Sequence, residues 1–79
     1  MPQVKETPHA LNQIKGLRLQ KRYAKQKALF ISNPAHRSLD FCMWDHKYRI
    51  CSFKITNKYR VKIIKDGDIY TVIDAGDYH

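Results

Sequence analysis

The clearest alternation of hydrophobic and polar positions lies in the second half of the chain. Between residues 53 and 73, runs of β-branched and aromatic side chains are interrupted by polar turns, which is the pattern of half-buried strands. Residues 53–61 read as two strands joined by a polar turn. The turn Asp66-Gly67-Asp68 then separates two further β-branched runs. Asp-Gly in this setting favours a type I′ hairpin, in which both central residues have positive φ. We therefore predict two consecutive hairpins.

Two more strand signals precede these hairpins. Residues 41–44, Phe-Cys-Met-Trp, form an apolar run that is typical of a buried strand, and Asp45-His46 marks a turn. Residues 48–56 alternate. Their two faces carry Arg49, Cys51, Phe53 and Ile55 on one side and Tyr48, Ile50, Ser52 and Lys54 on the other. Because neither face is purely polar, we expect a sheet that is covered on one side and functional on the other.

The first third of the chain carries helix signals. Thr7-Pro8 predicts a helix start, because Thr can cap the first free amides and proline at the first helical position loses no needed donor. Leu11 and Ile14 follow at helical spacing, and Gly16 is expected to end this helix.

A second helix is expected from about Leu17 to Ser32. Asn33-Pro34 should stop it, since the residue before a proline avoids the helical region. Its predicted apolar face consists of Leu17, Ala24, Ala28 and Ile31. Its opposite side carries Arg18, Lys21, Arg22, Lys25 and Lys27.

These elements, with a possible strand at residues 3–6, predict the order β-α-α-β-β-β. This is an α+β fold in which two N-terminal helices pack on a mostly antiparallel, twisted sheet. At 79 residues the chain should form one domain spanning residues 1–79, with a small core.

Charge is distributed unevenly along the chain. Residues 1–37 hold eight Lys or Arg and one Glu, whereas residues 38–79 hold seven Lys or Arg and six Asp. The first half therefore suits nucleic acid or an acidic protein partner, and it lacks the bulky apolar face that a membrane surface would require. The basic helix is either a solvated face or a surface that contacts phosphates.

Cysteine usage and the start of the chain favour a reduced, cytoplasmic protein. No apolar run approaches membrane-spanning length, and Met1-Pro2 begins no secretory signal. Cys42 and Cys51 read as core thiols within strands. Cys42, His46, Cys51 and His79 match no zinc spacing, so we predict no metal and no cofactor.

Lys54 and Arg60 are candidates for a phosphate site. Together with a nearby imidazole at the end of the chain, they would offer positive charge and a titratable group to a phosphate. A three-residue loop at Thr56-Asn57-Lys58 would pair Lys54 with Arg60, whereas a two-residue loop would put Ile55 opposite Arg60. The sequence leaves this register open. Position alone would also allow His79 to be a disordered terminal residue.

Three segments resemble the RelE/ParE superfamily of toxin–antitoxin toxins. Residues 33–41, Asn-Pro-Ala-His-Arg-Ser-Leu-Asp-Phe, resemble the loop before the sheet in that family. Residues 52–61, Ser-Phe-Lys-Ile-Thr-Asn-Lys-Tyr-Arg-Val, resemble its central hairpin. Residues 66–68 and 73–79 resemble its closing hairpin and tail, with a Tyr-His ending similar to that of the YoeB-like branch.

The resemblance implies a ribosome-dependent endoribonuclease that cleaves mRNA without a metal and that a small acidic antitoxin neutralises. The implied reaction is attack of a ribose 2′-hydroxyl on the adjacent phosphate. Such a step needs a base, a cation for the developing charge and an acid for the leaving oxygen.

By the same resemblance, Arg60 would stabilise charge, Lys54 would be a second electrostatic contact and His79 would be the general acid. Tyr78 would stack on a base or donate a proton. Further candidates for RNA or ribosome contact are Arg18, Lys21, Arg22, Lys25, Arg49 and Lys62.

Two points stay open. The resemblance gives no clean match for a carboxylate base, and Asp40 and Asp45 are the only acids near the expected position. A gyrase inhibitor of the ParE type, or a plain RNA-binding domain, would share the fold without the nuclease residues.

Overall fold

A computed structural model describes residues 2–78. Its elements are β1 (Gln3–Glu6), α1 (Pro8–Gly16), α2 (Gln20–Ser32), a short 3-10 helix η1 (Arg37–Leu39), β2 (Cys42–Asp45), β3 (Ile50–Lys54), β4 (Arg60–Asp66) and β5 (Ile69–Gly76). The strands form one sheet in the order β1-β5-β4-β3-β2. β1 runs parallel to β5, and the other neighbours are antiparallel.

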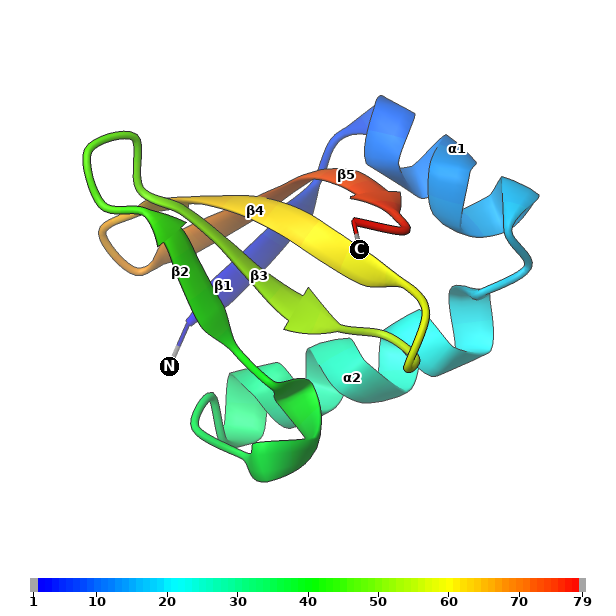
Figure 1. Ribbon diagram of the computed structural model, residues 1–79, viewed down its shortest axis with the longest axis horizontal. Coiled ribbons are helices and arrows are strands. Elements are labelled where there is room, and N and C mark those ends of the chain that lie inside the picture. The colour runs from blue at the N-terminus through cyan, green and yellow to red at the C-terminus, as the bar shows by residue number, and fades with distance from the viewer. Residues whose placement is uncertain (1, 79) are drawn as a thin grey trace.

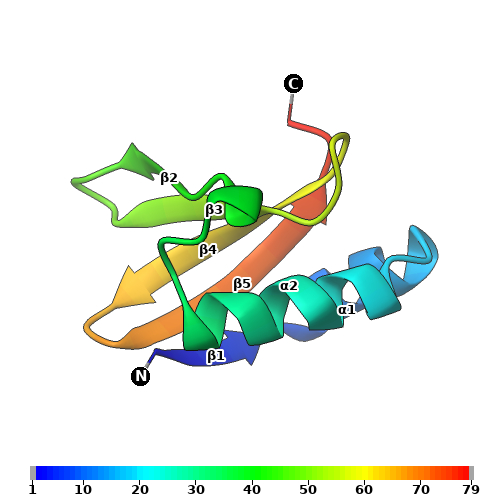
Figure 2. The same ribbon diagram turned by 90° about the horizontal axis from the view of Figure 1, so that it is seen from below.

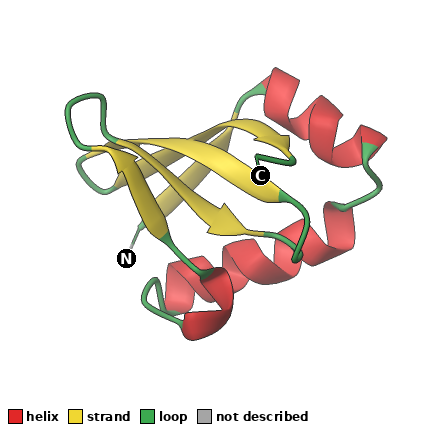
Figure 3. Ribbon diagram, in the orientation of Figure 1, coloured by secondary structure: helices red, strands yellow, loops and turns green. Residues whose placement is uncertain are grey.

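Helices and strands form two layers. α1 and α2 lie on one face of the twisted sheet, and the chain leaves β5 toward the opposite side (Figures 1 and 2). Colouring by secondary structure shows the same separation, with loops confined to the rim (Figure 3). The α+β class and the helix-on-sheet arrangement are confirmed. The N-terminal arm is a strand, and four strands follow the helices where the predicted order had three.

The first helix begins and ends where the sequence predicted. Thr7 is its N-cap, and the Thr7 Oγ1 atom accepts a 3.1 Å hydrogen bond from the Ala10 N–H. Pro8 is the first helical residue and Gly16 the last. This cap satisfies an amide that would otherwise lack an intrahelical partner.

The predicted apolar face of the second helix was wrong except at Leu17, which packs against the core. Ala24 and Ala28 are exposed, and the helix begins at Gln20 rather than near Leu17. The buried side chains are Leu19, Tyr23, Gln26 and Phe30, at spacings of four, three and four residues. Large aromatic side chains bury more apolar area than alanines, so they determine which side of the helix faces the sheet.

One polar contact helps to hold α2 in place. The Tyr23 hydroxyl donates a 2.6 Å hydrogen bond to Glu6 in β1, and burial together with this carboxylate raises the pKa of Tyr23. The Lys27 Nζ atom lies 2.7 Å from the same carboxylate. Lys27, predicted on the helix side opposite the apolar face, therefore neutralises the single glutamate of the chain.

The core lies between the helices and the alternate residues of the central strands. Cys51, Phe53, Val61 and Ile63 have no exposed surface, and the Phe53 ring stacks on Phe30 with centroids 5.2 Å apart. Burial raises the pKa of the Cys51 thiol to about 11, despite the opposing effect of Lys65. The prediction that Cys51 is a core thiol is confirmed.

The prediction of a buried strand at residues 41–44 was wrong. β2 is an edge strand, where Phe41 and Trp44 are 36% and 39% exposed and Cys42 is an exposed free thiol. Apolar composition alone cannot distinguish a central strand from an edge strand, because the neighbours that cover it are set by the sheet order.

The last hairpin is confirmed, but its turn differs from the prediction. Asp66 pairs with Ile69, so the loop consists of Gly67 and Asp68. Gly67 has φ of +60°, whereas Asp68 is not among the residues with positive φ. Positive φ at the first central residue alone is the type II′ pattern, which favours Gly at that position.

Within residues 2–78, no helix is both long enough and apolar enough to cross a membrane.

Candidate functional site

The β3–β4 ladder places Lys54 directly opposite Arg60. Their Cα atoms are register partners at the loop end of the hairpin, as the three-residue loop would require. The Ile55 N–H donates a 2.9 Å hydrogen bond to the Tyr59 carbonyl, which closes that loop. The register that the sequence left open is therefore the one that brings the two cations together.

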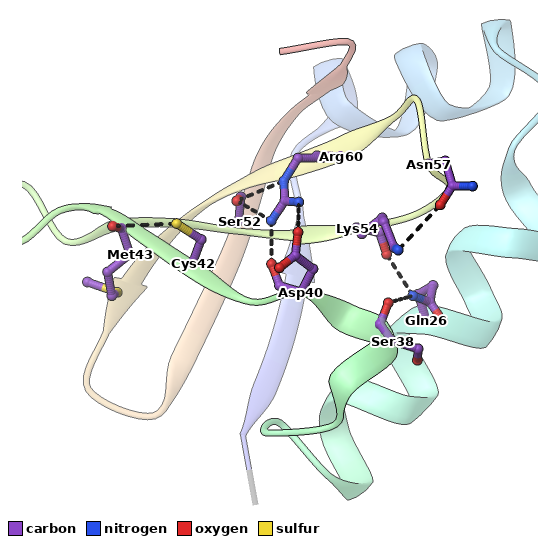
Figure 4. Close-up of polar contacts among 9 residues, drawn as sticks. All are labelled: Gln26, Ser38, Asp40, Cys42, Met43, Ser52, Lys54, Asn57 and Arg60. Carbon is purple, nitrogen blue, oxygen red and sulfur yellow. Dashed lines mark hydrogen bonds and ion pairs between the residues drawn. The ribbon is translucent and has the colours of Figure 1, made fainter. Parts of the chain in front are cut away.

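The Arg60 guanidinium is held from two sides (Figure 4). Its Nε and Nη2 atoms donate to the Ser52 Oγ atom at 3.2 and 3.0 Å, and Ser52 is fully buried. Its Nη1 atom donates to the Asp40 Oδ2 atom at 2.9 Å, and Nη2 also donates to the Asp40 carbonyl. Only 13% of the Arg60 side chain is exposed. This geometry fixes a planar donor fork against an anion.

Asp40 reaches Arg60 because of a local backbone turn. It ends η1 in the left-handed conformation, with φ 46° and ψ 48°, and its N–H donates to the Arg37 carbonyl. Asp tolerates this conformation better than most residues. The Asp40 side chain is 70% exposed, so the carboxylate lies at the surface beside a mostly buried cation. The sequence named Asp40 as a nearby acid but did not place it at Arg60.

An aromatic wall lies beside Arg60. Arg60 pairs with Gly76, and the Tyr78 ring folds back over Gly76, where an added Cβ would lie 3.8 Å from the Tyr78 Cζ atom. The Tyr78 ring meets the Trp44 ring edge-on at a centroid distance of 5.2 Å. The Lys62 Nζ atom lies 5.9 Å from the Trp44 ring centroid. Trp44, which the sequence placed in the core, is thus part of the exposed site.

Tyr78 is anchored by its neighbourhood. Burial raises its pKa, and the Asp74 carboxylate raises it further. For Asp74, burial alone would favour the neutral form. The proximity of Tyr78, Gln13, the Ala75 backbone and His9 outweighs burial and lowers the Asp74 pKa. The Tyr78 phenol therefore stays neutral at physiological pH and can donate a proton in a hydrogen bond.

The predicted residues do not all gather at this site. The structure brings together Lys54, Arg60, Lys62 and Tyr78. Arg49 lies in the turn before β3, at the far end of the hairpin, where its carbonyl accepts a hydrogen bond from the Lys65 N–H. His79 lies outside the described residues. The predicted helical cations Arg18, Lys21, Arg22 and Lys25 are all exposed.

Besides Trp44, two residues of the cluster were not among the predicted site residues. Ser52 carried a weak signal, since it stands two positions before Lys54 on the same predicted face. Asp40 carried none in the pattern of strands, because its position depends on the turn that ends η1.

Comparisons with known proteins were made on sequence and on structure. No family model matches the sequence, and a search of curated proteins finds no match. Solved structures do match. YafQ from E. coli superimposes with a TM-score of 0.75 at 7% identity, covering 99% of this chain and 94% of that chain.

Two further neighbours are toxins of the YoeB type. A YoeB/ParE toxin from Agrobacterium tumefaciens gives a TM-score of 0.72 at 12% identity, covering 98% of this chain and 99% of that chain. YoeB from Staphylococcus aureus, solved as a dimer, gives 0.73 at 14% identity, covering 99% and 97%. These identities are low, but the superpositions extend over nearly the full length of both chains. The predicted resemblance is therefore confirmed at the level of the fold, and the chain has the fold of the YafQ and YoeB toxins.

Proposed function

We propose that this protein is the toxin of a type II toxin–antitoxin system and that it cleaves mRNA on the ribosome. The observation that carries the proposal is the Arg60 fork, which is held by Ser52 and presented to an anionic oxygen at 2.9 Å. An RNA phosphate could take the place that the Asp40 carboxylate now occupies. Lys54, as the cross-strand partner of Arg60, would add a second positive charge at the same phosphate.

In the proposed reaction the ribose 2′-oxygen forms a bond to the adjacent phosphorus, and the bond from phosphorus to the 5′-oxygen breaks. The products are a 2′,3′-cyclic phosphate and a 5′-hydroxyl end. Asp40, once displaced from Arg60, is the carboxylate near enough to the phosphate position to accept the 2′-hydroxyl proton. Arg60 and Lys54 would stabilise the charge that develops on the phosphoryl oxygens.

The leaving 5′-oxygen needs a proton. By the resemblance of the tail, His79 is the proposed general acid, and Tyr78 would position or assist it. Trp44 and Tyr78 would hold a nucleobase on the aromatic wall, since every base has a face that can stack on an aromatic ring. These side chains supply a base, cations and an acid, so the proposed mechanism needs no metal or cofactor.

Binding to RNA would be driven by the basic surface. The formal net charge is +8, and the cations at Arg18, Lys21, Arg22 and Lys25 are exposed. Lys62 and Arg49 would contact backbone phosphates of mRNA or ribosomal RNA. Phosphate contacts of this kind dominate affinity and fall with salt. Action on translating ribosomes would place the protein in the cytoplasm.

We also propose an acidic antitoxin partner. YafQ has been solved in a complex with DinJ, and YoeB from Staphylococcus aureus in a heterotetramer with YefM. In the present chain, β1 and β2 are edge strands, which offer unpaired backbone groups to a partner segment. A partner that binds only the folded toxin should raise its melting temperature, and no rise with the product of the neighbouring gene would contradict this pairing.

The decisive test adds the protein to a translating extract and maps mRNA 5′ ends. We expect new 5′-hydroxyl ends in the wild-type reaction and none with Arg60→Gln. Intact mRNA with accumulating DNA–gyrase cleavage complexes would favour the ParE-like alternative instead. RNA binding without cleavage of RNA or inhibition of gyrase would indicate a binding domain.

A second arm tests His79 by pH. A general acid must be protonated, and an unperturbed imidazole titrates near 6.5, so wild-type cleavage should fall as pH rises through that region. His79→Gln should remove this limb of the profile, whereas Arg60→Lys should lower the rate and keep the limb. An unchanged profile in His79→Gln would remove His79 from the mechanism.

A further inference from the structure

A basic cleft lies between α2 and the β3–β4 loop, separate from the Arg60 fork. Its volume is about 360 Å³, and its lining includes three cations, Arg22, Lys25 and Lys54. The remaining polar lining residues are Gln26, Ser38, Thr56 and Asn57. No acidic residue lines it within the described part of the chain. The cleft therefore combines positive charge with neutral hydrogen-bonding groups, which suits an anion.

The walls of this cleft are fixed by a buried amide. The Gln26 Nε2 atom donates to the Lys54 carbonyl at 2.7 Å and to the Ser38 carbonyl at 3.2 Å, and Gln26 is only 8% exposed. Figure 4 shows this side chain reaching from α2 to both segments. The Thr56 Oγ1 atom accepts from two N–H groups of its own loop. The cations therefore project from a braced frame, which reduces the entropy lost on binding.

Lys54 belongs to both the cleft and the Arg60 site. It is the Cα partner of Arg60, and its Nζ atom lies 3.4 Å from the Asn57 Oδ1 atom in the cleft wall. Arg22 and Lys25, one turn apart on α2, face the same space from the other side. A line of positive charge thus leads from Arg60 through Lys54 to the helix.

We propose that this cleft binds the backbone phosphate next to the scissile one on the same RNA strand. This deepens the proposed function and rests on it. Arg22 and Lys25 would then grip substrate, whereas Arg18 and Lys21, outside the cleft, would add general attraction only. The line of cations matches an RNA strand, whose negative charges follow one another along the backbone.

An acidic peptide fits the cleft less well. Protein partners are usually anchored by apolar or aromatic side chains in desolvated pockets. Ile55 is the one apolar residue among those lining this cleft. The cleft therefore offers charge and hydrogen bonds but little apolar surface to an anchoring side chain.

The experiment measures binding of a single-stranded seven-nucleotide RNA with 2′-O-methyl groups, which cannot be cleaved, across a series of salt concentrations. The variant pair is Arg22→Gln with Lys25→Gln, and the matched control is Arg18→Gln with Lys21→Gln, which removes the same charge from neighbouring exposed positions. For single strands, each phosphate contact contributes about 0.7 to the slope of log affinity against log salt. Because the cleft is proposed to hold one phosphate, we expect the cleft pair to reduce the slope by about 0.7 and the control pair to change it less.

Length dependence gives a second readout. A two-nucleotide RNA, with one phosphate, should bind wild type and the cleft pair equally, because it reaches only the Arg60 site. Equal slopes of log affinity against log salt for the two variant pairs would overturn the inference. Failure of the wild-type protein to bind RNA at low salt would also overturn it. Loss of antitoxin binding in the cleft pair, with RNA binding intact, would assign the cleft to a protein instead.

The two proposals can fail separately. If Arg60→Gln abolishes cleavage while the cleft pair binds RNA as wild type does, the nuclease stands and the cleft inference fails. If the wild-type protein cleaves no mRNA but the cleft pair reduces the salt dependence of RNA binding, the cleft binds RNA and the nuclease proposal fails.

Discussion

The two faces of the β3–β4 ladder use alternate residues of the same strands for different purposes. On the helix side, Phe53 and Val61 are fully buried among apolar neighbours. On the other side, Lys54 and Arg60 are cross-strand partners, and the Ser52 hydroxyl accepts hydrogen bonds from Arg60. The helix-side face therefore needs apolar side chains that pack well, whereas the opposite face depends on particular polar atoms.

The faces should also fail in different ways. Apolar burial is non-directional and contributes through area, so its loss lowers stability. The polar face contributes directed hydrogen bonds and charge, so its loss should affect chemistry more than folding. Variants matched across the two faces can test this separation.

The largest expected effect is on stability, from Phe53→Ala. Truncating a buried Phe typically lowers the free energy of unfolding by about 3–5 kcal/mol, which is a large share of the stability of so small a domain. The matched control is Ile64→Ala on the opposite face of β4, where Ile64 is 40% exposed. Urea unfolding followed by circular dichroism measures both. Equal losses of unfolding free energy in the two variants would contradict the expected difference between the two faces.

The next largest effect is on activity, from Arg60→Gln. Removing one such charge-stabilising group costs about 2.7–4 kcal/mol of transition-state stabilisation, or roughly a hundred- to a thousand-fold in rate. Losing the partner of the buried Ser52 hydroxyl should lower stability by only about 1–3 kcal/mol.

The control for Arg60→Gln is Lys65→Gln, at the other end of β4, which should leave the mRNA cleavage rate unchanged. A rate loss no larger than the stability loss explains would contradict a chemical role for Arg60.

A smaller effect is expected from Trp44→Ala. Stacking of a base on an aromatic ring is worth about 1–3 kcal/mol, so affinity for a short RNA should fall by that amount while the fold persists. The control is Tyr48→Ala, since Tyr48 is 62% exposed in the turn between β2 and β3. Fluorescence titration with 2′-O-methyl RNA distinguishes them. Similar losses in both variants would exclude a specific aromatic wall.

The smallest effect concerns pH. The pKa of Asp74 is lowered in the folded protein, so its ionised form stabilises the fold above the unfolded value, near 3.9. That stability is lost as pH falls through the folded pKa. Asp74→Asn should therefore flatten the dependence of melting temperature on pH below about 4. Tyr78→Phe, which removes the phenol that helps to lower the Asp74 pKa, should weaken that dependence in the same direction. An unchanged acid limb in both would contradict the role of this contact.

Local patterns predicted much of the framework. The Thr7-Pro8 start, the Gly16 end and the Asp66-Gly67 hairpin follow from short-range chemistry, because capping and turn residues act within a few positions. The alternation grouped Cys51, Phe53 and Ile55 on one face, and the structure shows that this face is the covered one. The motif resemblance supplied the fold and drew attention to Arg60.

The sequence by itself thus determined the type and order of most elements, the bounds of the first helix, the end of the second helix and which residues could carry charge. Tertiary structure decided what those residues meet. It made Phe41–Trp44 lie at a sheet edge, turned Tyr23 and Phe30 rather than the alanines toward the core, and brought Asp40 to Arg60 across twenty positions. These outcomes depend on sheet order, on competition for buried area and on a single left-handed residue. Each is a contact between distant segments, whose energy no local pattern contains.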